Sequence, residues 1–188
     1  MSALLSVVQT LLPVSAALEA ALATALKREE WPARHQLLMP GQVARHLYFV
    51  ERGLVRGYAL HGSQEVCSWF MSEGDFVISI VSFLTQQPST EYMELLEPSV
   101  LYSVSYAQLQ ELYRTFPEFN YVGRVLTERY YVRSEQRAYQ LRTLPGKERY
   151  TRFLADYPAI AQRVPLKYLA TYLGVAPETL SRLRARRN

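Results

Sequence analysis

The sequence of 188 residues is poor in the residue types that build covalent or metal cross-links. Its single cysteine, Cys67, excludes an intramolecular disulfide, a four-thiolate iron–sulfur cluster and a cysteine-rich zinc site. The three histidines, His35, His46 and His61, form no His-x-His pair of the kind that metal-dependent jelly-roll enzymes use. The sequence therefore predicts no metal site and no required cofactor, and its lone thiol fits a reducing cytoplasm.

Long apolar runs and enzyme motifs are also missing. The segment Ala3–Leu26 is apolar, but Gln9, Pro13 and Glu19 interrupt it before it reaches the roughly 20 residues that a membrane span needs. Because no Lys or Arg precedes Lys27, we expect soluble helices here and neither a signal peptide nor a membrane segment. The sequence has no P-loop, G-x-S-x-G or G-x-G-x-x-G motif, so we do not expect an enzyme.

Charge is divided unevenly along the chain. Residues 1–140 contain 11 basic and 14 acidic side chains, a net charge of −3, whereas residues 141–188 contain 10 basic and 3 acidic ones, a net charge of +7. A basic segment beside an acidic body is typical of a polyanion-binding module joined to a domain with another task. On charge alone, a basic surface that only keeps the protein in solution is the alternative.

The middle of the chain has the pattern of a β structure. Short apolar runs alternate with turn residues such as Pro40-Gly41 and Ser72–Asp75, which is typical of a roll, sandwich or barrel. The seven predicted strands cover Leu37–Met39, Leu47–Val50, Leu54–Leu60, Val66–Met71, Phe76–Ile80, Met93–Leu96 and Val100–Val104. Cys67 falls in one of these strands, where it is either a small buried side chain or a redox switch.

Helical spacing returns after this region. It predicts a short helix over Ala107–Tyr113 and a long one over Glu118–Leu144, which would measure about 40 Å. A helix of this length must bury a stripe, and we predict a homodimer interface of mixed polarity; packing on the strands of its own chain is the alternative. Pro145-Gly146 then ends the helix and is a candidate hinge. The residues near one seam of the long helix are Val122, Val125, Val132 and Tyr139.

The most informative segment is Val164–Arg187. Pro165 and Pro177 can each begin a helix, and Gly174 lies between the two helices where a left-handed residue is needed. This order of helix, short turn with glycine, and helix predicts a DNA-binding helix-turn-helix; a helical hairpin without DNA contacts is the alternative. The apolar positions that would join the two helices are Leu166, Leu169, Ala170, Leu173, Val175, Leu180 and Leu183.

The second of these helices carries side chains suited to a major groove. Arg182 can pair with guanine O6 and N7, and Glu178 can accept a hydrogen bond from cytosine N4. Thr179 and Ser181 can reach a base or a phosphate. A solvated helix face is the alternative for each arginine. The predicted phosphate contacts are Lys167, Arg184 and Arg186.

Over nearly its whole length the sequence resembles the bacterial family of cyclic-AMP receptor protein and fumarate/nitrate regulators (Crp/Fnr). The resemblance rests on Pro40–Gln42, on Leu47–Val50 with Gly53, on the turn Glu73–Phe76, and on Glu178–Arg182 in the second helix of the tail. It implies an α+β protein: a cyclic nucleotide-binding-like jelly roll (double-stranded β-helix) over residues 1–116, a dimerisation helix over 117–144, and a helix-turn-helix domain over 145–188. It further implies a homodimer on inverted-repeat, double-stranded DNA, and RNA polymerase as a further partner.

Two departures from the family limit what the resemblance implies. The family's glutamate and arginine for the ribose and the cyclic phosphate fall near Ile78-Ser79 and Ser89-Thr90, where this sequence has neither. Without the charge-assisted partner of the phosphate, cyclic AMP in the usual mode is not expected, and the effector, if there is one, is another small molecule. The given sequence also ends after the second helix, so no wing is expected. Candidate pocket residues are Ser79, Ser82, Ser89, Thr90 and Ser134, with ordinary loop hydroxyls as the alternative.

Together these features predict a cytoplasmic transcription regulator. The alternative is a ligand-sensing adaptor whose basic tail binds a protein partner. The charge of the tail and the spacing of its second helix favour DNA over a protein as the partner.

Overall fold

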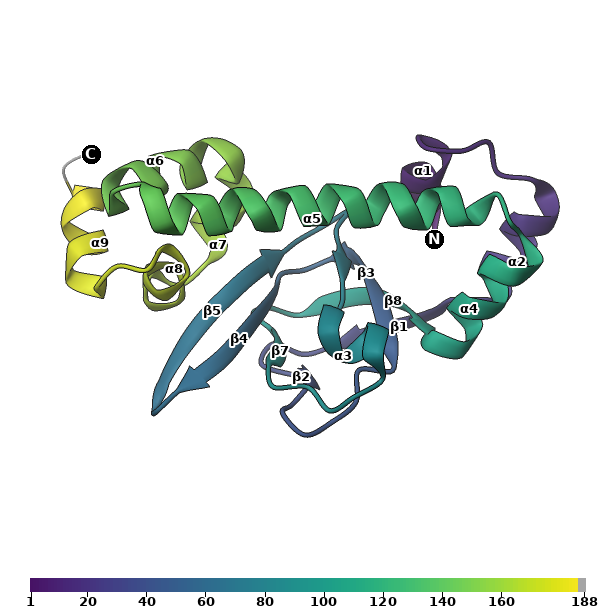
Figure 1. The fold of residues 1–188 in the computed structure, drawn as a ribbon, viewed down its shortest axis with the longest axis horizontal. Coiled ribbons are helices and arrows are strands. Elements are labelled where there is room, and N and C mark those ends of the chain that lie inside the picture. The colour runs from purple at the N-terminus through teal and green to yellow at the C-terminus, as the bar shows by residue number, and fades with distance from the viewer. Residues whose placement is uncertain (186–188) are drawn as a thin grey trace.

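The computed structural model describes residues 1–185 of the chain. One long helix, α5 (Phe119–Thr143), runs along the length of the molecule (Figure 1). N-terminal helices lie at one end of α5, a β-roll lies beside its middle, and C-terminal helices lie at its other end. α5 is therefore the element that connects the two helical ends.

The β-roll consists of two four-stranded antiparallel sheets, with strand orders β1-β8-β3-β6 and β2-β7-β4-β5. Each of the seven predicted strands overlaps an observed one, which confirms the predicted jelly roll. The strands are β1 (Lys27–Trp31), β2 (Gln36–Leu38), β3 (His46–Arg52), β4 (Val55–His61), β5 (Gln64–Met71), β6 (Phe76–Val77), β7 (Tyr92–Leu95) and β8 (Ser99–Ser105).

Two elements of the roll differ from the sequence prediction. Strand β1 is not predicted because four of its five residues are charged; it is an edge strand, paired only with β8, and keeps most of these charges at the surface. The predicted strand over Phe76–Ile80 ends at Val77, and helix α3 (Ile80–Thr85) follows it. This helix forms because Phe83 is buried in the core and its N–H donates to the carbonyl oxygen of Ser79.

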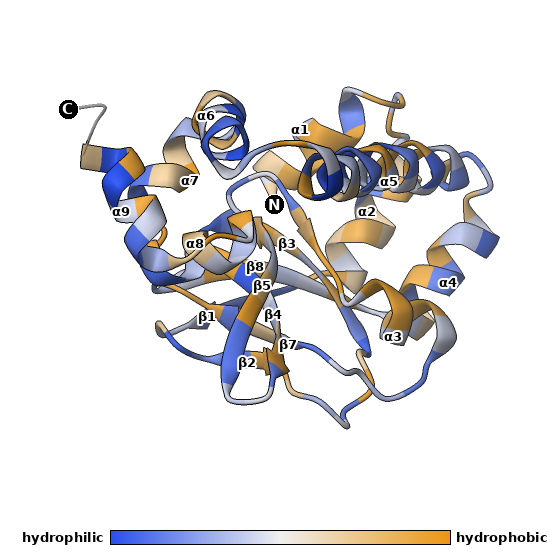
Figure 2. Ribbon diagram, turned by 60° about the vertical axis from the view of Figure 1, so that its left-hand side comes forward, coloured by the Kyte–Doolittle hydropathy of each residue, from blue (hydrophilic) through white to orange (hydrophobic). Residues whose placement is uncertain are grey.

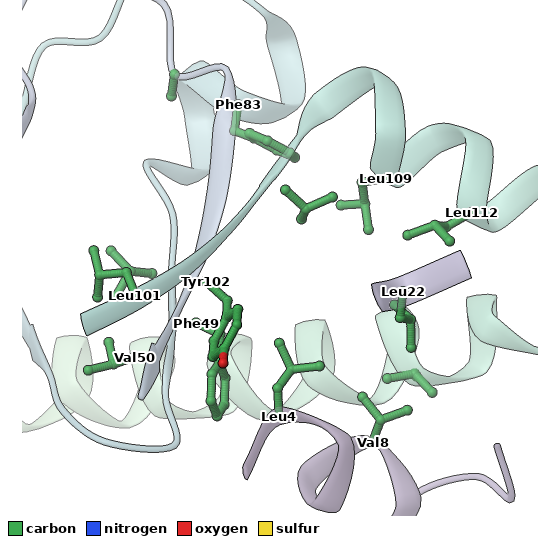
Figure 3. Packing of buried hydrophobic residues seen from close by; sticks show 14 of the residues in the cluster. Leu4, Val8, Leu22, Phe49, Val50, Phe83, Leu101, Tyr102, Leu109 and Leu112 are labelled. Carbon is green, nitrogen blue, oxygen red and sulfur yellow. The ribbon is translucent and has the colours of Figure 1, made fainter. Parts of the chain in front are cut away.

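The N-terminal helices share one hydrophobic core with the roll (Figure 3). Phe49 and Tyr102, from the paired strands β3 and β8, lie beside each other in it, and α1 (Ser2–Gln9) adds Leu4 and Val8. The N-terminal apolar segment is thus helical, as predicted, and buries its apolar side chains in the protein. Within residues 1–185, no helix has the length and apolar character that a membrane crossing requires. The other helices that close this core are α2 (Ala16–Ala25) and α4 (Tyr106–Thr115).

The C-terminal helices form a second core together with the roll. Leu54, Tyr58, Cys67 and Phe70 of the roll are buried among residues of these helices, and α8 packs against β5 (Figures 1 and 2). The segments that the sequence divides at residue 145 are therefore joined by side-chain packing as well as by the chain. The helices are α6 (Gly146–Asp156), α7 (Pro158–Arg163), α8 (Leu166–Leu173) and α9 (Pro177–Ala185).

Candidate functional site

Helices α8 and α9 meet at a tight turn. α8 ends at Gly174, whose φ of 62° lies in the left-handed region that favours glycine. The N–H groups of Gly174 and Val175 donate to the carbonyl oxygens of Thr171 and Ala170, which satisfies the open end of α8. α9 begins at Pro177, the residue predicted to start the second helix. The two helices and the turn lie where the sequence predicts them, and their role on DNA stays a prediction.

Buried apolar side chains hold α9 against α8. Leu180 of α9 is 1% exposed, and Ala170 and Leu173 of α8 are buried beside it in the second core. Burial of a leucine of this kind contributes about 2 kcal/mol. This packing decides which face of α9 points away from the protein.

The outward face of α9 carries the predicted DNA contacts. Glu178, Ser181, Arg182 and Arg184 are exposed, and Thr179 is half-buried. Hydrophilic residues cover much of α9 in Figure 2. On α8 the predicted contact Lys167 is also exposed, with its Nζ 4.6 Å from the centre of the Tyr168 ring, and the predicted contact Arg186 lies outside the described residues.

Arg149 of α6 fastens this unit to the end of α5. Its guanidinium donates to the carbonyl oxygens of Leu144, Leu173 and Gly174. Gly146 lies under the same turn, where an added Cβ would come 2.5 Å from Cγ1 of Val175. Glycine at this position therefore permits close packing, and the segment suggested as a hinge is held by hydrogen bonds on both sides.

The serines at the predicted ligand positions of the roll are brought together. The hydroxyls of Ser79 and Ser89 lie 3.3 Å apart, and Ser79 donates to the carboxylate of Glu91 at 2.6 Å. Ser82 accepts a hydrogen bond from the Ala44 N–H instead. Ser79, Ser82 and Ser89 are buried and bonded to groups of their own chain, whereas Thr90 is exposed.

A cavity of about 670 Å³ extends between α5 and the rest of the protein. Ile80, Val81 and Leu84 of α3 line it, and so does Glu91. Of the five predicted pocket residues only Ser134, which is exposed on α5, is among its lining residues. Any ligand in this space would meet mainly apolar walls, the carboxylate of Glu91 next to the serines, and further charged side chains on the helices, which are Arg133, Arg137, Arg149 and Asp156.

The predicted seam on α5 is divided by the fold. Val122 is 1% exposed because it packs in the core of its own chain, and Val125 is half-buried. Val132 and Tyr139 are 51% and 58% exposed. Only the second half of the helix therefore presents the predicted residues on a free face.

A sequence profile identifies the central domain of the chain. The profile of the cyclic nucleotide-binding domain family matches residues 28–116. Residues 28–116 belong to that family. No curated protein sequence gives a significant match to the chain.

Around this cyclic nucleotide-binding domain, the whole chain has the fold of Crp/Fnr transcription regulators. The c-di-GMP responsive regulator CLP of Xanthomonas campestris is 22% identical, with a TM-score of 0.73 and coverage of 92% of this chain and 91% of that one. FixK2 of Bradyrhizobium japonicum is 17% identical, with a TM-score of 0.76 and coverage of 86% and 83%. A Crp/Fnr regulator of Eubacterium rectale is 15% identical, with a TM-score of 0.68 and coverage of 90% and 82%.

A cyclic nucleotide is the ligand that the domain family implies, and the residues present do not fit its phosphate. Ser79 and Ser89 lie near the predicted positions of the family's glutamate and arginine, and the carboxylate of Glu91 lies beside Ser79. A phosphate at this point would meet a like charge in place of a guanidinium. Ser79, Ser89 and Glu91 therefore offer no cation to a cyclic phosphate.

The sequence did not predict the residues that form hydrogen bonds between distant segments of the chain. Glu91 and Arg149 belong to no sequence motif, because their partners lie in other segments and only the fold brings them together.

Burial raises the pKa of the Cys67 thiol, and the smaller effect of the nearby Arg56 in the opposite direction does not cancel this, so the thiol stays protonated. Within residues 1–185, no three His, Cys, Asp or Glu side chains are grouped to hold a metal ion.

Proposed function

We propose that this chain is a transcription regulator that binds double-stranded DNA as a homodimer on an inverted repeat. The observation that carries the proposal is the two-sided character of α9. Leu180 is buried against α8, and Glu178, Ser181 and Arg182 are exposed on the helix. An exposed helix held on a rigid partner by its apolar side is what major-groove recognition requires.

The charge of the C-terminal region supports the same conclusion. Residues 141–188 have a net charge of +7, and exposed cations lie on both helices of the unit, Lys167 on α8 and Arg184 on α9. These side chains would neutralise phosphates without reading the sequence, and binding should weaken steeply as salt is raised.

The exposed apolar residues support a homodimer. Large apolar patches are uncommon on the surface of monomers and mark interaction sites. α5 and α3 both carry such residues, and in a dimer joined along α5 an inverted repeat would require the two α9 helices to lie about 34 Å apart. The exposed residues are Tyr131, Val132, Tyr139 and Leu141 on α5, and Ile80, Val81 and Leu84 on α3.

We expect neither cyclic AMP nor cyclic GMP to act as effector in the family's usual mode. The carboxylate of Glu91 beside Ser79 supports this expectation, because it would repel a phosphate bound there; an effector of this protein would be a small molecule without an anionic group at that point. RNA polymerase would be a further partner of the DNA complex.

Fluorescence anisotropy on duplexes selected from a random library tests the proposal. Arg182→Ala should cost roughly 1 to 3 kcal/mol on the selected sequence and relax discrimination at one base position. The control, Arg152→Ala, removes an exposed arginine that pairs with Glu148 within α6, and should leave this discrimination unchanged. Equal losses on selected and scrambled DNA for Arg182→Ala would refute base recognition. Absence of binding at both about 50 and about 200 mM salt would favour the protein-binding adaptor.

A further inference from the structure

A buried arginine of the roll reaches the first helix of the C-terminal unit. Arg56 of β4 is 1% exposed, and its guanidinium lies between the rings of Tyr58 and Tyr168, 4.0 and 3.6 Å from their centres. Glu94 and Glu65 of the roll pair with the same guanidinium. The charge is thus neutralised within the roll, and α8 supplies the aromatic face that covers it.

Tyr168 is therefore a specific contact and not a general apolar one. A guanidinium over a tyrosine ring is attractive beyond the area that it buries, most of all where water is excluded. Moving α8 away would expose the ring and leave the Arg56 cluster to be hydrated. Separation of the two parts is opposed by the loss of the contact between Arg56 and Tyr168 and by the exposure of the ring to water, which the hydration of the charges offsets only in part.

A second arginine ties α5, β5 and α8 together. Arg137 of α5 donates to the carbonyl oxygens of Ser68 and Tyr172, each at 2.9 Å, and its guanidinium lies 3.8 Å from the centre of the Tyr172 ring. Beside it, the backbone N–H of Cys67 donates to Oγ1 of Thr171 at 3.2 Å. Backbone groups of the roll and of α8 are thus bridged at one place.

A third arginine joins helix α7 to loops of the roll. Arg163, the last residue of α7, donates to the carboxylate of Glu73 at 2.8 and 2.9 Å and also pairs with Glu97. Both carboxylates belong to loops of the roll. The C-terminal helices are therefore fixed at separate points, which restricts rotation as well as separation.

From these contacts we propose that Arg56, Arg137, Arg163 and Tyr168 are positioning residues for α9. They hold the C-terminal helices and the cyclic nucleotide-binding domain as one rigid body, so that α9 has one fixed orientation without any bound effector. None of the four residues lies on α9. The inference rests on the proposed function, because orientation matters only if α9 reads DNA.

Amide hydrogen exchange tests the rigid joint without DNA. The variant Tyr168→Leu with Arg163→Gln removes both contacts from the C-terminal side and leaves the Arg56 charge cluster of the roll paired. We expect exchange of residues 64–71 and 166–173 to accelerate together by about tenfold or more in this variant. The control Arg152→Gln, which breaks an ion pair inside α6, should leave both segments unchanged. Unchanged exchange in the variant, or acceleration in only one segment, would overturn the joint.

Arg163→Gln alone provides the second measurement, because this partly exposed side chain can be changed with little risk to folding. A dimer with fixed α9 helices should prefer its operator over one with two extra base pairs between the half-sites by about tenfold or more. The variant should lose much of this spacing preference and keep its base discrimination. Equal spacing preference in both proteins would overturn the positioning role. Failure of the wild type to bind any DNA would instead refute the proposed function, while hydrogen exchange would still decide the joint.

Discussion

Replacing Glu73 with Gln should lower the stability of the protein at neutral pH by about 1 kcal/mol. Glu73 accepts two hydrogen bonds from Arg163, at 2.8 and 2.9 Å, and one from the backbone N–H of Gly53 at 2.8 Å. Gln keeps an acceptor for Gly53 but has no charge, so the change isolates the ion pair. Because the Glu73 side chain is 42% exposed, solvent screens the ion pair. The expected loss of stability therefore lies at the upper end of the values for surface ion pairs and below those for buried ones.

This stabilisation should disappear in acid. Burial alone would raise the pKa of Glu73, but the hydrogen bonds from Arg163 and from the backbone outweigh it and hold the pKa at about 2, against an ordinary value of 4.5. Between these two values the unfolded chain binds more protons than the folded one. The contribution of Glu73 is therefore complete above about pH 4.5 and is lost as the pH falls towards about 2.

Urea unfolding of wild type and Glu73→Gln at about pH 7 and about pH 3 measures this difference. The loss caused by Glu73→Gln should be clearly smaller at the lower pH. Glu148→Gln is the matched control, since Glu148 pairs with Arg152 inside one helix and should cost only about 0.3 kcal/mol. A loss of equal size at both pH values, or none at neutral pH, would refute the reasoning.

Three further experiments, two with substitutions and one with a labelling reagent, test other parts of the structure. Leu180→Ala should cost about 2 to 5 kcal/mol in urea unfolding and abolish specific DNA binding, whereas the half-buried Leu183→Ala should cost less; similar small costs would contradict the packing of α9 on α8. Gly174→Ala should cost about 1 kcal/mol, and Gly174→Asn less, because asparagine tolerates a positive φ; the reverse order would contradict a left-handed turn. Cys67 should react with iodoacetamide only in step with unfolding, because it is buried with a raised pKa; rapid labelling of the native protein would show otherwise.

Local pattern was sufficient for most elements of the fold. Apolar spacing predicted the long helix α5. The two prolines and Gly174 between them predicted where α8 lies and where α9 begins, because these signals depend on neighbours in the sequence. Strand β1 was not predicted, since its charged side chains do not alternate with apolar ones. It is a strand because it pairs with β8. Helix α3 was missed for a similar reason, because burial of Phe83 overrides an apolar run that suits a strand.

By itself the sequence determined the order of the elements, the basic character of the tail and the absence of the family's phosphate-binding arginine. The tertiary structure alone decided that Glu91 bonds to Ser79, and that Arg56 of the roll lies against Tyr168 of α8. The first set depends on residue types and on short-range spacing, which can be read along the chain. The second depends on which residues the folded chain brings within a few ångströms of each other, and more than 100 residues separate Arg56 from Tyr168.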